Sequence, residues 1–344
     1  MFEGLEGNQP VMERLQRIAA AGRVPNALLL AGPEGVGKKQ FALRVARALV
    51  CREQKDIGCG QCSACLRVLD IALPAADKKE DFEQVHFTGH PDVGMVVPYR
   101  SGILINAIRD LEKEANFRPF EADVRVFVID DAERLNPAAS NALLKTLEEP
   151  PPGTFIMLVS ARPDSLLPTI LSRCQMVRFS PLATEDVERH LAALGRFSSD
   201  DAALAARLSG GSLGRAIEMD LEGFRAGRDA MFSVLESSCG KPDLAAMLRV
   251  SEQMADAKNK DRFEAQLDIL SMLIRDLWAA SKGADPSSLI NADVSGRIAE
   301  IAKRADAARL AKWLDEVEEL RRQLLLNVNK RISTDALFVK MAAT

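Results

Sequence analysis

The sequence predicts an α/β domain built on a parallel sheet, followed by two all-helical regions. Three observations support this prediction. Over roughly the first 180 residues, short apolar runs typical of buried strands alternate with segments of helical periodicity. A glycine-rich turn joins the first apolar run to a helix, as in phosphate-binding loops. After about residue 184, the apolar positions recur at helical spacing.

Length and composition bound the class of protein. A chain of 344 residues suggests two or three domains, and we expect boundaries that give domains 1–181, 182–220 and 221–344. Hydrophobic content of 47% and charged content of 27% are typical of a soluble globular protein. We see neither a secretory signal nor an apolar run of membrane length, so we expect a cytoplasmic location. The net charge of −4 argues against a chain that coats nucleic acid by itself.

The elements of the first domain follow from local patterns. Asn136-Pro137 marks a helix start, because asparagine caps helices and proline suits the first helical position. His86 and His90 fall in a stretch with no predicted element. We interpret them as solvated loop residues rather than zinc ligands or catalytic groups, because no partner ligands stand at the expected spacing. Strands are expected at 27–31, 124–129, 154–160 and 175–179, and helices at 11–21, 38–51, 104–115 and 138–147.

The glycine-rich turn has the form of a phosphate cradle, with one departure. Gly32, Gly35, Gly37 and Lys38 match a G-x-x-x-x-G-K motif between a strand and a helix. Backbone N–H groups would point at phosphate oxygens there, and Lys38 would supply a positive charge. The next position, where a Ser/Thr hydroxyl helps to hold Mg²⁺, is Lys39. We therefore expect weak ATP binding and a poorly held Mg²⁺.

An acidic turn follows the strand at 124–129. Asp130 is placed where a carboxylate would face a nucleotide-bound Mg²⁺. Asp131 stands where a glutamate normally polarises the attacking water, and its side chain is one methylene shorter. A misplacement of ~1 Å can cost ~10²-fold in rate, so efficient hydrolysis by this chain is not expected. Glu133 could substitute only if the turn bends differently. The alternative is that these acidic residues simply end a strand in solvent.

Four cysteines lie within fifteen positions, in the pattern Cys51-x7-Cys59-x2-Cys62-x2-Cys65. Four thiolates can close a tetrahedral shell on Zn²⁺, which leaves no open position, so such a site is structural. Two excess negative charges would remain on the site. The alternatives are free or redox-paired cysteines, or an iron–sulfur cluster. The cations close in sequence that could offset the charge are Arg52, Lys55 and Arg67.

Three motifs together resemble the bacterial clamp-loader branch of AAA+ proteins. They are the segment 141–151 (N-A-L-L-K-T-L-E-E-P-P), Ser172-Arg173-Cys174, and the four-cysteine module. The resemblance implies that Arg173 is an arginine finger that reaches the γ-phosphate of ATP on a neighbouring motor subunit. It also implies that Arg215 is a second sensor touching nucleotide. From the residues alone, Arg173 would be a surface arginine with a carboxylate partner, and Arg215 an exposed helix arginine.

Within that family the chain resembles the delta-prime (stator) type more than the gamma and tau motors. The motors carry Ser/Thr and Glu where this chain has Lys39 and Asp131. The resemblance implies a DNA polymerase III complex with gamma/tau and delta subunits that places a sliding clamp on primed DNA. It also makes 182–220 a lid and 221–344 a collar domain. The alternatives are an active gamma-type ATPase, or a zinc-knuckle nucleic-acid adaptor with a vestigial nucleotide fold.

The helical regions carry no cluster of chemically active residues. Short helices are expected at 184–194, 199–209 and 213–219. Apolar stripes at 263–278 and 299–326 are typical of a domain core. Ser333-Thr334 is expected to cap a final helix.

Overall fold

The computed structural model describes the chain except for residues 3–4, 6, 56, 76–77, 257–261, 325–327 and 344. The chain divides into two compact units. The first comprises Met1–Ala193 and Ser209–Ile217, and the second Leu194–Leu208 and Glu218–Thr344. The division into three domains at residues 181 and 220 remains a prediction.

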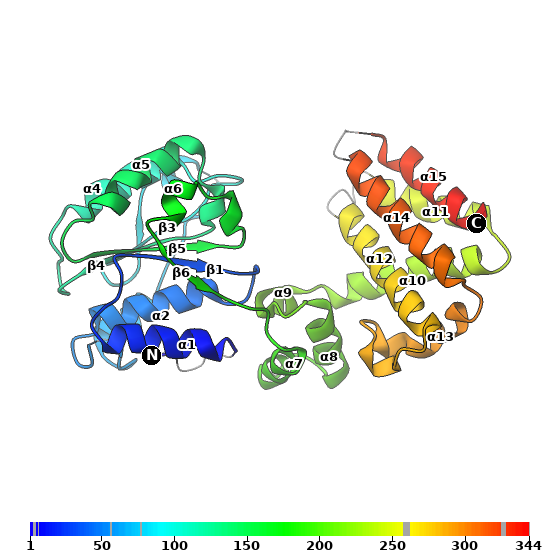
Figure 1. Ribbon diagram of the computed structural model, residues 1–344, viewed down its shortest axis with the longest axis horizontal. Coiled ribbons are helices and arrows are strands. Elements are labelled where there is room, and N and C mark those ends of the chain that lie inside the picture. Colours follow the sequence, from blue (N-terminus) through cyan, green and yellow to red (C-terminus); the bar gives the residue numbers. More distant parts are fainter. Residues whose placement is uncertain are drawn as a thin grey trace. The chain divides into compact units, whose positions relative to one another are not determined.

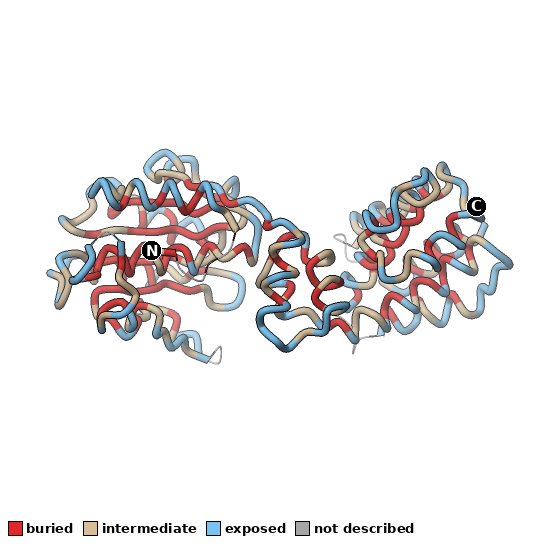
Figure 2. The backbone as a smooth tube through the Cα atoms, turned by 90° about the horizontal axis from the view of Figure 1, so that it is seen from below, coloured by how far each residue is buried: buried red, intermediate tan, exposed pale blue. Residues whose placement is uncertain are grey.

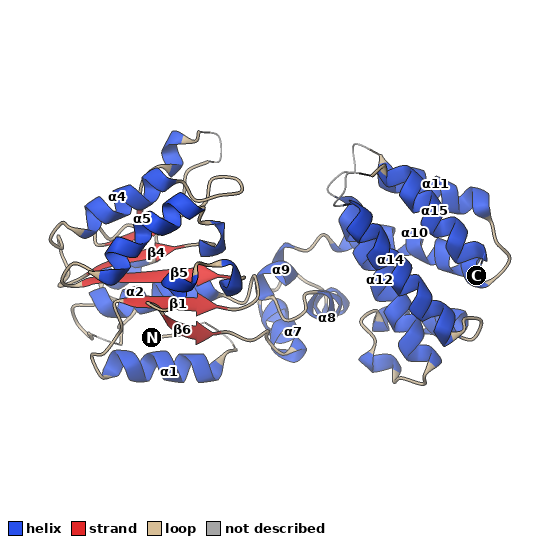
Figure 3. Ribbon diagram, turned by 45° about the horizontal axis from the view of Figure 1, so that its top comes forward, coloured by secondary structure: helices blue, strands red, loops and turns tan. Residues whose placement is uncertain are grey.

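A six-stranded sheet forms the centre of the first unit (Figures 1 and 3). Neighbouring strands are parallel except β2 and β3, which are antiparallel. The parallel sheet is therefore confirmed. The short hairpin β2–β3 was not predicted. The order is β2 (His86–Phe87), β3 (Val93–Val96), β4 (Arg125–Ile129), β5 (Thr154–Ser160), β1 (Ala27–Ala31) and β6 (Gln175–Arg178).

Helices cover both faces of this sheet (Figure 3). Because side chains alternate along a strand, Leu28 and Leu30 pack on one face while Leu29 packs on the other. The first face is covered by α1 (Gln9–Ala20) and α2 (Lys38–Val50). The second face is covered by α4 (Ile105–Ala115), α5 (Pro137–Glu148) and α6 (Pro168–Leu171). The small helix α3 (Ser63–Val68) packs against α2.

The register of the parallel strands brings the predicted motifs to one edge of the sheet. Leu30 of β1 lies opposite Val159 of β5, and Ile129 of β4 lies opposite Leu158 of β5. The glycine-rich turn after β1 and the acidic turn after β4 are thus separated by a single strand. The sequence folds them into neighbours although about 90 residues separate them.

Three short helices follow the sheet, close to the predicted positions. They are α7 (Thr184–Ala193), α8 (Ser199–Leu208) and α9 (Leu213–Glu218). Helices α7 and α9 belong to the first unit and α8 to the second.

The rest of the second unit is helical, with a core that includes Phe232, Phe263, Trp313 and Phe338. Figure 2 shows the buried positions recurring along its helices. None of its described helices, nor any in the first unit, has the length and apolar character needed to cross a bilayer. The long helices are α10 (Leu221–Cys239), α11 (Leu244–Ala255), α12 (Arg262–Ser281), α13 (Ser295–Ala302), α14 (Ala307–Leu324) and α15 (Lys330–Ala343).

Two details of the helical prediction were wrong. The stripe at 299–326 belongs to two helices, because the chain turns between α13 and α14; its last two positions lie outside the described residues. Ser333 and Thr334 lie inside α15 rather than capping it. The helix begins at Lys330, and Asn329 Oδ1 accepts the Ile332 N–H at 3.2 Å in the capping role.

Candidate phosphate-loop site and metal centre

The lysine of the phosphate loop is bound by the loop itself. Lys38 is 6% exposed, and its Nζ donates to the carbonyl oxygens of Gly32 at 2.7 Å and Pro33 at 2.6 Å. Burial lowers the pKa of Lys38, while nearby carboxylates, Glu133 first among them, act to raise it. A phosphate entering the loop would have to replace these two carbonyl oxygens.

Lys39 and Asp130 form an ion pair across the sheet edge. Lys39 Nζ lies 3.0 Å from Asp130 Oδ2, and the Asp130 side chain is 15% exposed. The ammonium therefore binds the carboxylate expected to face Mg²⁺, from the position where a Ser/Thr hydroxyl would hold that ion. A metal ion at this place would have to displace the Lys39 ammonium from Asp130, and the displaced ammonium would still repel the ion from nearby.

The other two carboxylates of the acidic turn have different neighbours. Asp131 has φ +48°, a left-handed conformation that is uncommon for aspartate, and its Oδ2 lies 3.4 Å from Arg134 Nε. Burial and the adjacent Asp130 raise the pKa of Asp131. Glu133, in the turn η2 (Ala132–Arg134), accepts the Ala161 N–H at 3.2 Å. Glu133 therefore binds the end of β5.

The start of α9 lies against the phosphate loop. Gly214 N–H donates to Gly35 O at 2.9 Å. Gly35 has φ +73°, and a Cβ at this position would lie 2.1 Å from Ser212 Oγ, so only glycine fits. Arg215 follows directly, is exposed, and donates its backbone N–H to Ser212 Oγ at 3.2 Å. The structure thus brings Arg215 to the loop by its backbone.

Arg173 lies at the surface of the first unit, just after α6. Its Nη1 donates to Thr169 O at 2.9 Å and to Ser172 Oγ at 3.3 Å. Its Nη2 lies 2.5 Å from Glu148 Oε1, and the side chains of Arg173 and Glu148 are 33% and 49% exposed. Glu148 is the last residue of α5 and lies within the segment 141–151, one of the three motifs that carry the family resemblance. The sequence alone assigned no role to Glu148.

The four cysteines converge as predicted. Their Sγ atoms all lie within 4.8 Å of one another, with Cys51–Cys62 at 4.0 Å and Cys59–Cys65 at 3.8 Å. Tetrahedral Zn–S bonds of about 2.3 Å place neighbouring sulfurs ~3.8 Å apart, whereas a disulfide needs ~2.05 Å. The donor set fits a four-coordinate metal ion such as zinc, and the separations do not fit disulfides.

Backbone N–H groups surround the sulfurs. Cys51 Sγ accepts from Gln54 and Cys59, and Cys62 Sγ accepts from the Cys65 N–H at the start of α3. Burial acts to raise the pKa of the Cys51 thiol, but these N–H donors lower it to about 7. The N–H donors therefore favour at Cys51 the thiolate form that a metal ion binds, whereas burial and the neighbouring cysteines raise the pKa of the Cys65 thiol.

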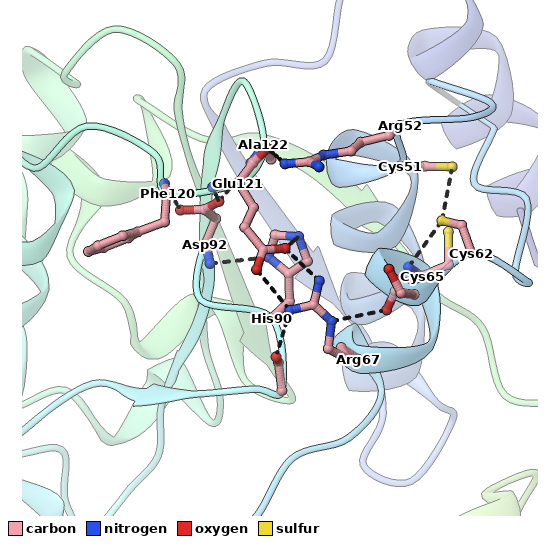
Figure 4. Close-up of polar contacts among 12 residues, drawn as sticks. Cys51, Arg52, Cys62, Cys65, Arg67, His90, Asp92, Phe120, Glu121 and Ala122 are labelled. Atoms are coloured by element: carbon pink, nitrogen blue, oxygen red, sulfur yellow. Dashed lines mark hydrogen bonds and ion pairs between the residues drawn. The ribbon is translucent and has the colours of Figure 1, made fainter.

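The three cations expected to offset the thiolate charge, Arg52, Lys55 and Arg67, bind residues 121–123. Arg52 donates to the Glu121 carbonyl, and Lys55 lies 2.9 Å from Asp123 Oδ2. Arg67 makes two hydrogen bonds to the Glu121 carboxylate, at 3.0 and 2.5 Å. Figure 4 shows the Glu121 side chain between Arg67 and His90. These contacts fasten the four-cysteine module to residues 121–123.

A buried arginine beside the module was not predicted. Arg47 of α2 is 5% exposed and donates to Met1 O at 2.7 Å. Its Nη1 would lie 3.6 Å from a Cβ at Gly60, which stands between two of the cysteines. No local sequence signal marks Arg47, because it occupies an ordinary helix position.

The interpretation of the histidines as solvated loop residues was wrong for His90. His90 is fully buried, its Nδ1 accepts the Asp92 N–H at 3.2 Å, and burial lowers its pKa. Asp92 is also fully buried and accepts three consecutive backbone N–H groups, those of 120–122, at 2.7–2.8 Å (Figure 4). The unpredicted hairpin β2–β3 carries both residues into the core. The interpretation was wrong for His86 as well, which lies in strand β2 rather than in a loop and is half-buried beside Phe82.

Comparisons with known proteins give a consistent result. Residues 7–183 match the family model described as "DNA polymerase III, delta subunit", and residues 224–338 match "DNA polymerase III, delta subunit, C terminal". The delta' subunit of DNA polymerase III from Escherichia coli K12 is 30% identical over 318 residues, covering 92% of this chain and 88% of that protein. The delta' subunit from Bacillus subtilis is 27% identical, covering 93% and 91%.

More distant similarities were also found. The tau subunit from Bacillus subtilis is 29% identical over 187 residues, which are 54% of this chain and 30% of tau. Among solved structures, a gamma subunit-related protein from Thermotoga maritima matches with a TM-score of 0.36 at 18% identity, covering 96% of this chain and 98% of that one. The clamp loader delta protein from Bacillus subtilis matches with a TM-score of 0.35 at 10% identity, covering 97% and 100%.

Proposed function

Because the chain belongs to the DNA polymerase III delta' family and has a clamp-loader role, we propose that it is the non-motor stator of this complex. In this role it joins gamma/tau and delta subunits in the cytoplasm to place a sliding clamp on primed DNA. The observation that carries the proposal is the Lys39–Asp130 ion pair at 3.0 Å, which puts an ammonium where a motor subunit holds Mg²⁺.

The phosphate-loop site supports a chain that binds ATP weakly and hydrolyses it poorly. Lys38 is held by carbonyl oxygens of its own loop, and Asp131 lies beside Arg134. Glu133 Oε1 accepts the Ala161 N–H just after β5, so each of the two acids already has a contact within the protein that competes with activation of water. We further propose that Arg215 contacts any nucleotide that does enter, and that Zn²⁺ held by the four cysteines is structural.

Arg173 is proposed to act in trans. Its guanidinium is exposed on the first unit, so a neighbouring subunit's ATP can approach it. A guanidinium stabilises the charge that develops on transferring phosphoryl oxygens, which is the role of an arginine finger. A chain with a disabled site of its own and an exposed finger contributes to catalysis only in the assembled complex.

Reconstitution with gamma and delta subunits tests this proposal. We expect clamp loading on primed DNA to require the chain, while the isolated chain hydrolyses ATP far more slowly than the motor subunit. Motor-like hydrolysis by the isolated chain would favour a gamma-type ATPase instead. Tight DNA binding by the isolated chain, with a steep dependence on salt, would favour the nucleic-acid adaptor.

Replacing Lys39 by serine is expected to restore Mg²⁺-dependent nucleotide binding. The substitution releases Asp130 and returns a hydroxyl to the position that normally helps to hold the ion. We expect the affinity of the isolated chain for a fluorescent ATP analogue to rise at least about tenfold with Mg²⁺ and little with EDTA. Lys55→Ser, which removes a lysine paired with Asp123, is the control. Equal affinities of Lys39→Ser and wild type in Mg²⁺ would contradict the assignment.

An exposed apolar surface on α11 and α15 is proposed to contact other subunits in the collar. Arg331 lies 3.0 Å from Glu252, so the two helices run side by side. Ile332 and Val339 are seven residues apart and therefore share one face of α15. We call this region the α11/α15 surface; its members and exposures are Leu244 (45%), Leu248 (38%), Ile332 (66%) and Val339 (44%).

Ile332→Glu combined with Val339→Glu is expected to weaken assembly by more than about tenfold, because charges would be buried in an apolar contact. Size-exclusion chromatography of the reconstituted complex at falling concentrations measures this. The control is Ala311→Glu, which adds a charge at an exposed position of α14. Normal assembly of the double variant would show that the α11/α15 surface lies outside the collar contacts.

A further inference from the structure

We propose that Glu148 is a positioning residue for Arg173, an inference that rests on the proposed role of Arg173 as a finger in trans. The Arg173 guanidinium contacts three acceptors: Thr169 O, Ser172 Oγ and Glu148 Oε1. Two of them lie within four residues of Arg173 and move with the same turn of chain. Glu148 is the contact that ties the guanidinium to a different element, α5.

The helix that carries Glu148 is firmly placed. Asn136 Oδ1 caps its start by accepting the Ala139 N–H at 2.8 Å. Leu143 and Leu147 bury its inner face against the sheet, at 0% and 7% exposure. Glu148 is the last residue of α5, so its carboxylate projects from a rigid element rather than from a loop.

The pair leaves donors available for a phosphate. A guanidinium has five N–H donors, and the three contacts engage two on Nη1 and one on Nη2. Two N–H groups therefore remain to meet phosphoryl oxygens while Glu148 holds the group in orientation. Arginine recognises phosphate through this planar arrangement of donors, so its orientation matters as much as its charge.

Because the Arg173–Glu148 pair is partly exposed, a positioning role and a structural role predict different effects of losing Glu148. With side chains 33% and 49% exposed, the ion pair contributes little to folding stability. A displacement of ~1 Å in a group that contacts the transition state, in contrast, can cost ~10²-fold in rate. Loss of Glu148 should therefore change catalysis in the complex without changing the thermal stability of the chain.

The test uses the complex reconstituted with motor and delta subunits and measures kcat, KM and the melting temperature of the free chain. We expect Glu148→Ala to remove most of the ATP hydrolysis that Arg173→Ala removes, through kcat rather than KM. Glu148→Gln keeps an acceptor oxygen and should retain most activity, and Glu148→Asp should be intermediate. Glu149→Ala, which removes the adjacent exposed carboxylate, is the matched control and should behave as wild type.

The outcomes distinguish a failure of the trans role of Arg173 from a failure of the positioning role of Glu148. If Arg173→Ala itself has no effect, the proposed trans function fails. If Arg173→Ala lowers the rate but Glu148→Ala does not, the finger stands and the positioning role is wrong. A higher rate with Glu148→Ala would mean that the carboxylate restrains the finger, which overturns positioning. A further loss when Glu148→Ala is added to Arg173→Ala would mean that Glu148 acts elsewhere.

Discussion

Replacing Arg173 by alanine is expected to abolish the ATP hydrolysis at the neighbouring site that this chain serves, while the complex still assembles. Arginine fingers accelerate hydrolysis by about 10³–10⁵-fold where they act in GTPases, so the effect should be large. Arg173→Lys keeps the positive charge but loses the planar set of donors, and we expect only partial recovery. Single-turnover hydrolysis by the reconstituted complex measures both variants.

The control is Arg162→Ala. Arg162 is another exposed arginine of the same unit, and its backbone N–H, which donates to Ser160 Oγ, is unaffected by truncation of the side chain. Hydrolysis should therefore match wild type. If Arg173→Ala also matched wild type in an intact complex, Arg173 would be a surface arginine whose partner is simply Glu148.

Replacing Cys62 by serine is expected to remove the metal ion and unfold the four-cysteine module. Structural zinc sites contribute ~10–16 kcal/mol in zinc-finger peptides, which exceeds what the short α3 can recover from packing. Loss of the module would also release Arg67 from Glu121. We expect the zinc content to fall from one ion per chain to none, with a lower melting temperature.

Cys239→Ser is the control for this experiment. Cys239 lies at the end of α10, apart from the four-cysteine module, and burial raises the pKa of its thiol. It should leave both the zinc content and the assembly of the complex unchanged. A Cys62→Ser chain that kept one zinc per chain and its melting temperature would show that the four thiolates do not form a structural site.

Local sequence patterns were sufficient for the parts of the site that lie within one loop. The strand, glycine-rich turn and helix around the phosphate loop and the convergence of the four cysteines each depend on nearby residues, and both were found where the sequence placed them. Nucleotide binding at the loop stays a prediction. The Lys39–Asp130 pair joins residues 91 positions apart, so sequence could name each partner but not their contact. The same holds for Arg173 and Glu148: both lie in motifs that the sequence identified, but their contact is seen only in the structure.

Buried polar groups were the least predictable feature. Arg125 opens β4 and is 1% exposed, with Glu114 Oε2 at 3.2 Å and three aromatic rings around its guanidinium. Asp92 and His90 are likewise enclosed. A charged residue is normally placed at the surface, and only tertiary partners make its burial tolerable. Those partners come from segments that no local pattern connects.

We propose that this chain contributes a guanidinium to another subunit's ATP and does not use its own phosphate loop for hydrolysis. The most direct measurement is ATP hydrolysis by the reconstituted complex carrying Lys38→Ala in this chain, with assembly checked in parallel. We expect a rate equal to wild type, because within the described residues the hydrogen bonds of the Lys38 ammonium go to its own loop. A fall as large as that caused by Arg173→Ala would contradict it, since the loop would then be taking part in hydrolysis.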